Sequence, residues 1–177
     1  MTVSESRSIP SRLAPVLEAL ELDQPRVVTA DSLAQLARDQ RVDIDGVHLA
    51  YELRRLGWLL GLRTKGAWEF VPGARAGRFD AGDRYIELRA AIAVDAEFQG
   101  ALAMESAAVA LGLAGRIPDR EVLWVPPDNR APKSFGNWRV IRLPVRDDGI
   151  ASVDGLPTWR AGALLGGLGR GRPGVHH

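Results

Sequence analysis

The chain has 177 residues, the length of one large domain or two small ones. Apolar residues make up 46% and charged residues 25% of the sequence, which excludes wholesale disorder. No stretch is long and apolar enough to span a membrane, and residues 1–11 lack the apolar run of a signal peptide. The absence of cysteine excludes disulfides, thiol nucleophiles and Cys-based metal sites. We therefore expect a folded cytoplasmic protein without a membrane partner.

Positive charge is concentrated in one part of the chain. The formal net charge is only +1, which is too balanced to predict a nucleic-acid partner by itself. Residues 54–78, however, hold six basic residues against Glu69 alone. Any surface that attracts phosphate groups is therefore expected in this region.

The hydrophobic periodicity of the N-terminal part predicts three short helices. In residues 11–22, apolar side chains recur at the i, i+3, i+4 and i+7 positions of one helix face. Thr29 is expected to cap a second helix that ends near Gln40, and Asp45 to cap a third helix whose C′ residue is Gly57. The tight connection between the second and third helices is typical of a helix-turn-helix.

A β-hairpin is predicted directly after the third helix. Residues 58–62 and 67–72 are rich in aromatic and branched side chains, and the Gly-containing turn 63–66 lies between them. The order of three helices and then a hairpin with a basic tip predicts a winged helix-turn-helix over residues 1–78. Trp58, Trp68 and Phe70 are expected in the core under this hairpin, because they lie within the strand runs.

A second domain is expected after the Gly-rich joint at residues 73–83. The overall fold class is α+β: the winged helix-turn-helix of residues 1–78, a small α+β domain of residues 79–150, and a Gly-rich, flexible tail of residues 151–177. The elements expected in the second domain are helices at 84–98 and 103–115 and strands at 121–126 and 138–145.

The exposed face of the third helix carries the candidate DNA-reading residues. At 100° per residue, His48, Tyr51, Glu52 and Arg55 lie within about 100° of one another and away from the leucine side. Arg55 suits a guanine edge or a phosphate, His48 and Tyr51 can donate to phosphates or bases, and Glu52 can accept from cytosine. The alternative is an ordinary solvated helix face.

The hairpin tip supplies three more candidates. Arg63, Thr64 and Lys65 suit a wing that follows the phosphate backbone or the minor groove, where they would position the protein without specifying sequence. The alternative is a loop tip that charge keeps soluble.

Enzymatic chemistry is not expected. The histidines are His48, His176 and His177, so at most one imidazole lies within a predicted element, too few for a triad or a metal cluster. Gly169, Gly171 and Gly174 match a dinucleotide fingerprint by chance, because no strand precedes them. Residues 170–173 resemble the core of an AT-hook that lacks its second flanking proline. We expect no cofactor and no metal.

Residues 10–145 resemble the AbiEi-type antitoxins of type IV toxin-antitoxin systems, especially their actinobacterial branch. The most specific matches are the Leu-Arg-Arg-Leu-Gly-Trp-Leu run that leads into a Lys-Gly-x-Trp hairpin at residues 53–68, and the Ser-Ala-Ala-x-x-x-Gly-Leu helix at residues 106–113. Longer members of the family continue past the strand that matches residues 140–145, whereas this chain becomes Gly-rich.

The resemblance implies an antitoxin that represses its own operon through the winged helix. Its second domain would oppose a partner toxin of the nucleotidyltransferase class, and double-stranded operator DNA would be the other partner. Arg54 lies within the matching motif and joins the DNA-facing set. Palindromic operators imply paired binding domains, so cooperative or dimeric binding on DNA is expected. The alternatives are a protein-interaction module built on a winged helix and a ligand-sensing regulator.

Overall fold

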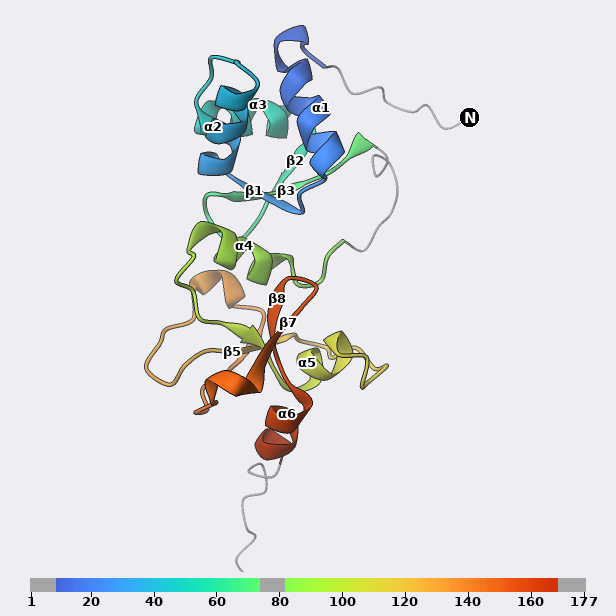
Figure 1. Cartoon of the computed structure of the whole chain (residues 1–177), viewed down its shortest axis with the longest axis vertical. Helices are drawn as coiled ribbons and strands as arrows, with labels where there is room; N and C mark the ends of the chain where they lie inside the picture. Colours follow the sequence, from blue (N-terminus) through green and yellow to red (C-terminus); the bar gives the residue numbers. More distant parts are fainter. Residues whose placement is uncertain (1–8, 74–81, 169–177) are drawn as a thin grey trace, which may run out of the picture. The chain divides into compact units, whose positions relative to one another are not determined.

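The structure is a computed structural model that describes residues 9–73 and 82–168. The chain divides into two compact units, residues 1–96 and residues 97–177. The described residues form six α-helices and two sheets, which confirms the mixed α+β class predicted from the sequence (Figure 1).

The first unit packs four helices around a three-stranded antiparallel sheet. The strand order is β1-β3-β2, and β3 pairs with both neighbours in antiparallel register. Figure 1 shows α1, α2 and α3 on one side of this sheet and α4 on the other. The elements are a 3₁₀ turn at Ser11–Leu13, α1 (Ala14–Asp23), β1 (Val27–Thr29), α2 (Ala30–Asp39), α3 (Gly46–Arg55), β2 (Leu59–Gly61), β3 (Ala67–Phe70) and α4 (Ile86–Val94).

Local capping fixes the ends of α2 and α3. The Thr29 hydroxyl accepts from the Ser32 N–H at 3.1 Å, and the Ser32 hydroxyl accepts from the Thr29 N–H at 2.8 Å, a reciprocal capping box. Asp45 caps α3 by accepting from the His48 N–H at 2.9 Å. Gly57 follows α3 with a φ of 81°, a left-handed conformation that favours glycine. These three ends agree with the sequence-based predictions.

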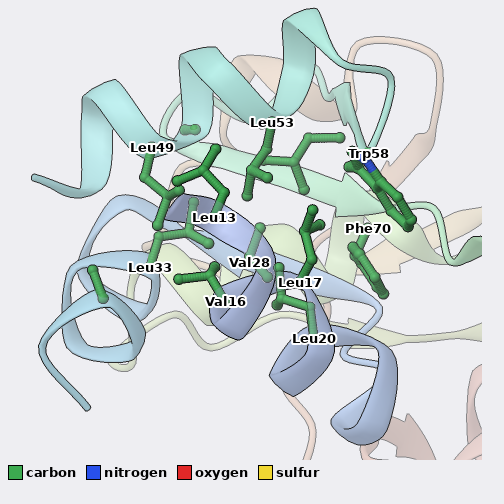
Figure 2. Packing of buried hydrophobic residues seen from close by; sticks show 13 residues of the cluster. Leu13, Val16, Leu17, Leu20, Val28, Leu33, Leu49, Leu53, Trp58 and Phe70 are labelled. Carbon is green, nitrogen blue, oxygen red and sulfur yellow. The ribbon is translucent and has the colours of Figure 1, made fainter. Parts of the chain in front are cut away.

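The core of the first unit lies between α1, α2, α3 and the sheet (Figure 2). Trp58 and Phe70 stack with ring centroids 6.4 Å apart, and both are buried, as the sequence predicts. Trp68 is only partly buried and packs against the same cluster. The cluster of buried residues comprises Leu13, Val16, Leu17, Leu20, Val28, Leu33, Ala37, Leu49, Ala50, Leu53, Trp58, Leu59 and Phe70.

The predicted domain boundary after residue 78 is wrong. Helix α4 was expected in the second domain, yet it packs on β1 and β3 and belongs to the first unit, which ends at residue 96. Its buried residues are Leu88, Ala90 and Ala91. Strand β1 was also missed, because Val27 and Val28 form too short an apolar run to predict a strand. In the structure β1 pairs with β3 of the predicted hairpin, and α4 packs against β1 and β3.

The second unit is built on a five-stranded mixed sheet with the order β6-β5-β4-β8-β7. β4 pairs with β8 and β5 with β6 in parallel, whereas β4–β5 and β7–β8 are antiparallel. Helix α5 packs against β5 and β8 and contacts α6. The elements are β4 (Ala101–Leu102), α5 (Met104–Ala110), β5 (Val122–Trp124), a 3₁₀ turn at Lys133–Phe135, β6 (Arg139–Ile141), a 3₁₀ turn at Asp147–Gly149, β7 (Ile150–Val153), β8 (Leu156–Trp159) and α6 (Ala161–Leu168).

The prediction of a flexible tail from residue 151 is wrong for residues 151–168. Asp154 and Gly155 have φ values of 50° and 75°, the two positive values of the tight turn that an Asp-Gly pair favours in a hairpin. The hairpin places Thr158 and Trp159, both buried, beside β4. High glycine content predicts disorder here, whereas the Asp-Gly turn signal in the same segment indicates a hairpin. The dinucleotide-like glycines, the AT-hook-like residues 170–173, His176 and His177 lie outside the described residues.

Candidate nucleic-acid interface

The face of α3 opposite the core is open to solvent. Leu49, Ala50 and Leu53 are buried on one side of the helix. On the other side, the exposed fractions are 77% for the His48 side chain, 66% for Tyr51 and 57% for the Arg55 side chain. The helical periodicity that predicted these exposed positions therefore agrees with the structure.

Glu52 and Arg55 form an ion pair on this face. The Arg55 guanidinium donates to the Glu52 carboxylate at 2.9 Å, one turn along α3, and Arg12 lies 3.9 Å from the same carboxylate. The hydrogen bond from Arg55 lowers the pKa of Glu52, and Glu52 in turn raises the pKa of Arg55. Glu52 was expected as a free acceptor for cytosine; the structure places it instead as a half-buried partner of two cations.

His48 is held by the residue that caps its helix. The ring Nδ1 contacts the second carboxylate oxygen of Asp45, while the first oxygen accepts from the His48 N–H. The hydrogen bond from this backbone group lowers the pKa of Asp45, and the ring contact lowers it further. Because Asp45 engages Nδ1, Nε2 is the ring nitrogen left to meet a ligand.

Arg54 connects α3 to the hairpin. A Cβ built on Gly61 of β2 would lie 3.3 Å from a guanidinium nitrogen of Arg54. The Arg54 side chain therefore lies over the glycine of β2. The basic C-terminal end of α3 and the first hairpin strand consequently form one continuous surface.

The hairpin tip is attached to α4. The Arg63 N–H donates to one oxygen of the Glu87 carboxylate at 3.0 Å, and the Thr64 N–H and hydroxyl donate to the other at 3.2 and 3.1 Å. Thr64 was expected to contact phosphate; its hydroxyl is half-buried and already bonded, so it does not belong to the exposed set. Arg63 and Lys65 are exposed, and neither side chain has an ion-pair partner among the residues that the structure describes.

Two residues of this surface were missed by the sequence reasoning. Val47, in the first turn of α3, is 64% exposed although it is apolar. Its helical position next to Tyr51 and Arg54 was a usable signal. Arg12 reaches Glu52 from a position forty residues earlier in the chain, and no spacing in the sequence predicts such a contact.

Residues 9–73 and 82–168 contain no group of three or more His, Asp or Glu side chains that could hold a metal ion. None of the helices in those residues combines the length and the apolar character needed to cross a membrane.

The chain is similar to a solved structure, that of the RV2827C protein from Mycobacterium tuberculosis, with a TM-score of 0.75 and 33% sequence identity over 92% of this chain. The match covers 61% of that protein, so this chain spans about three fifths of its length. No family model and no curated protein matches the sequence.

Proposed function

We propose that the protein is a non-enzymatic transcriptional repressor that binds operator DNA through a winged helix formed by α1–α3 and the β2–β3 hairpin. The observation that carries the proposal is the continuous surface that runs from the exposed face of α3 through Arg54 to Gly61 of the hairpin. A major groove admits one α-helix, and a basic hairpin beside it can follow the neighbouring phosphates.

The side chains of this surface divide into two roles. His48, Tyr51 and Arg55 would meet base edges, and the exposed Val47 would contact the methyl group of thymine. Arg54, Arg63 and Lys65 would contact phosphates and fix the register of the protein on the duplex. Phosphate contacts release counterions, so binding would weaken steeply with rising salt concentration.

The proposal extends to an antitoxin of a type IV toxin-antitoxin operon. This part is supported by the resemblance of residues 53–68 and 106–113 to AbiEi-type antitoxins. The second unit, with its mixed sheet and helices α5 and α6, would then oppose a nucleotidyltransferase toxin. The similar mycobacterial structure supports the fold over 92% of the chain.

Fluorescence anisotropy with the protein's own promoter and a shuffled duplex, at about 150 mM salt, tests DNA binding. We expect tighter binding to the promoter, and we expect the double variant Arg55→Ala, Lys65→Ala to lose most of the affinity. A matched control is Arg116→Ala, Lys133→Ala, which removes the same two types of charge from exposed positions of the second unit. Equal affinity for both duplexes would refute the repressor proposal.

Co-expression with the product of a neighbouring nucleotidyltransferase gene tests the antitoxin part. We expect the wild-type chain to restore growth. The Arg55→Ala, Lys65→Ala variant should still restore growth while it fails to repress, because both substitutions lie in the first unit. Absence of rescue by the wild-type chain would leave a repressor without antitoxin activity.

A second candidate is a protein-interaction module in which the same face of α3 docks a partner protein. It is favoured by the pairing of Arg55 with Glu52 and of His48 with Asp45, which leaves exposed Val47 and Tyr51 as the apolar part of the face. In that case the wild-type chain would show no promoter preference, and Tyr51→Ala would weaken the complex with that partner protein.

A further inference from the structure

The tip of the β2–β3 hairpin is held by a single carboxylate of α4. Three donors converge on Glu87: two consecutive backbone N–H groups, those of Arg63 and Thr64, and the Thr64 hydroxyl, at 3.0 to 3.2 Å. These bonds join positions 23 and 24 residues apart in the sequence. A hydrogen bond to a charged acceptor is stronger than one between neutral groups, so three of them fix the tip.

Helix α4 is itself fastened to the sheet at its N-terminal end. The Asp83 carboxylate accepts from Arg26 at 3.0 Å, from the Tyr85 N–H at 2.9 Å and from the Nε of Arg89. Burial alone would raise the pKa of Asp83, but these hydrogen bonds outweigh it and leave the pKa below its ordinary value. Glu87 therefore projects from a helix that is tied to β1 and β3 and not from a loose segment.

The hydrogen bonds to Glu87 hold the backbone of the hairpin tip and leave the side chains of Arg63 and Lys65 exposed. Gly66, at the other side of the turn, has a φ of 80°, and no atom of residues 9–73 and 82–168 beyond its chain neighbours lies within 4 Å of the position of a Cβ, so packing among these residues does not hold that side of the tip. With the backbone of Arg63 and Thr64 bonded to Glu87, the cationic side chains of Arg63 and Lys65 are displayed from a fixed backbone. A binding loop that is already ordered loses less conformational entropy on association.

We propose that Glu87 is a positioning residue for DNA binding, which orders the hairpin tip so that Arg63 and Lys65 meet the phosphate backbone. The inference rests on the proposed function. Simple electrostatics predicts the opposite change in affinity when Glu87 is removed, because a carboxylate beside a phosphate site repels DNA and its removal would tighten binding. The two effects can therefore be separated by the direction of the change in affinity.

The test compares Glu87→Ala and Glu87→Gln with the wild-type chain in promoter titrations. Glu87→Ala should weaken binding about three- to tenfold, the range expected for ordering about one side chain. It should also speed hydrogen exchange at the Arg63 and Thr64 amides. Glu87→Gln keeps one acceptor oxygen at this position, so it should bind the promoter more tightly than Glu87→Ala. The charge control is Glu18→Ala on α1, an exposed site, which should bind as well as the wild-type chain or slightly better.

A double-mutant cycle of Glu87→Ala with Thr64→Val adds a second test, and Thr64→Val alone can still be measured if Glu87→Ala folds poorly. Thr64→Val removes only the hydroxyl bond at 3.1 Å and should cause a smaller loss of affinity. If Thr64 acts through Glu87, the double variant should bind no more weakly than Glu87→Ala alone. Additive losses would mean that Thr64 contacts DNA directly.

Unchanged or tighter promoter binding by Glu87→Ala, or additive losses in the cycle, would overturn the role of Glu87. Such a result would leave the proposed function intact, since the wild-type chain would still prefer its promoter. A wild-type chain without promoter preference would instead refute the proposed function, and the role of Glu87 with it.

Discussion

The guanidinium of Arg55 donates to the carboxylate of Glu52 at 2.9 Å, on the face of α3 that points away from the core. The cation best suited to read a guanine is therefore already neutralised before any ligand arrives. For Arg55 to meet a base or a phosphate, this bond has to be exchanged. The pair reduces the attraction of the free protein for DNA of any sequence.

We expect Glu52→Gln to tighten binding to shuffled DNA several-fold. The substitution removes the charge that occupies Arg55 and lies 3.9 Å from Arg12, so both cations become available to phosphates. The slope of log affinity against log salt should become steeper by up to about one unit. Anisotropy titrations at four or more salt concentrations measure both quantities. An unchanged slope would show that Arg55 does not reach the DNA.

Gly46→Ala should destabilise the first unit. A Cβ at this position would lie 1.9 Å from the backbone oxygen of Ala30 and 3.1 Å from the backbone nitrogen of Ala34, so α3 would have to move away from α2. We expect a loss of about 1–3 kcal/mol in the free energy of unfolding, the usual effect of overpacking. Urea denaturation measures it.

The matched control for this prediction is Gly162→Ala in α6. Among the residues that the structure describes, none outside its own helix and its chain neighbours lies within 4 Å of the Cβ position there, so the substitution should be neutral or stabilise by up to about 1 kcal/mol through helix propensity. Equal effects of the two substitutions would contradict close packing at Gly46.

The attachment of α4 should weaken in acid. The pKa of Asp83 is lower in the folded protein than its ordinary value, so the unfolded chain takes up this proton first as the pH falls. The stabilisation is thus complete above about pH 4 and is lost as the pH falls through the lower, folded value. The protection factors of the α4 amides, which correct the exchange rates for their intrinsic dependence on pH, should fall over this range. In Asp83→Asn these factors should be lower at neutral pH and should change less with acid. An equal acid dependence in the variant would point to another group.

Ser106→Ala should destabilise the second unit. The buried Ser106 hydroxyl accepts from the Val122 N–H at 2.8 Å and donates to the Glu121 carboxylate, which joins α5 to the start of β5. Its removal leaves a buried N–H without that partner, at a cost of about 1–3 kcal/mol. The midpoint of urea unfolding should fall accordingly, whereas Ser152→Ala, at an exposed position of β7, should leave it unchanged. A similar effect of both substitutions would show that the hydroxyl of Ser106 is not structural.

Short-range signals in the sequence are sufficient to predict the helix ends that local contacts determine. Thr29, Asp45 and Gly57 determine helix ends through contacts within a few residues, and each was predicted correctly. The exposed positions of α3 follow from the same periodicity that buries Leu49 and Leu53. These features need no knowledge of the rest of the fold.

The elements that were misplaced depend on contacts distant in sequence. The spacing in residues 84–98 predicts a helix but not the sheet that it covers, so α4 was assigned to the wrong unit. The engagement of Thr64 by Glu87 joins two segments that no periodicity relates. By contrast, the hairpin at Asp154 was predictable, because an Asp-Gly pair between apolar runs is a strong turn signal.

The position of β8 in the second sheet affects the order in which the protein can fold during synthesis. The described elements of the first unit all lie before residue 97, so its sheet and core can form early in translation. β4 pairs with β8 more than fifty residues later in the chain, so its edge stays unpaired until Thr158 has emerged from the ribosome. A ribosome that stalls before that point would expose an open strand edge, a surface prone to aggregation.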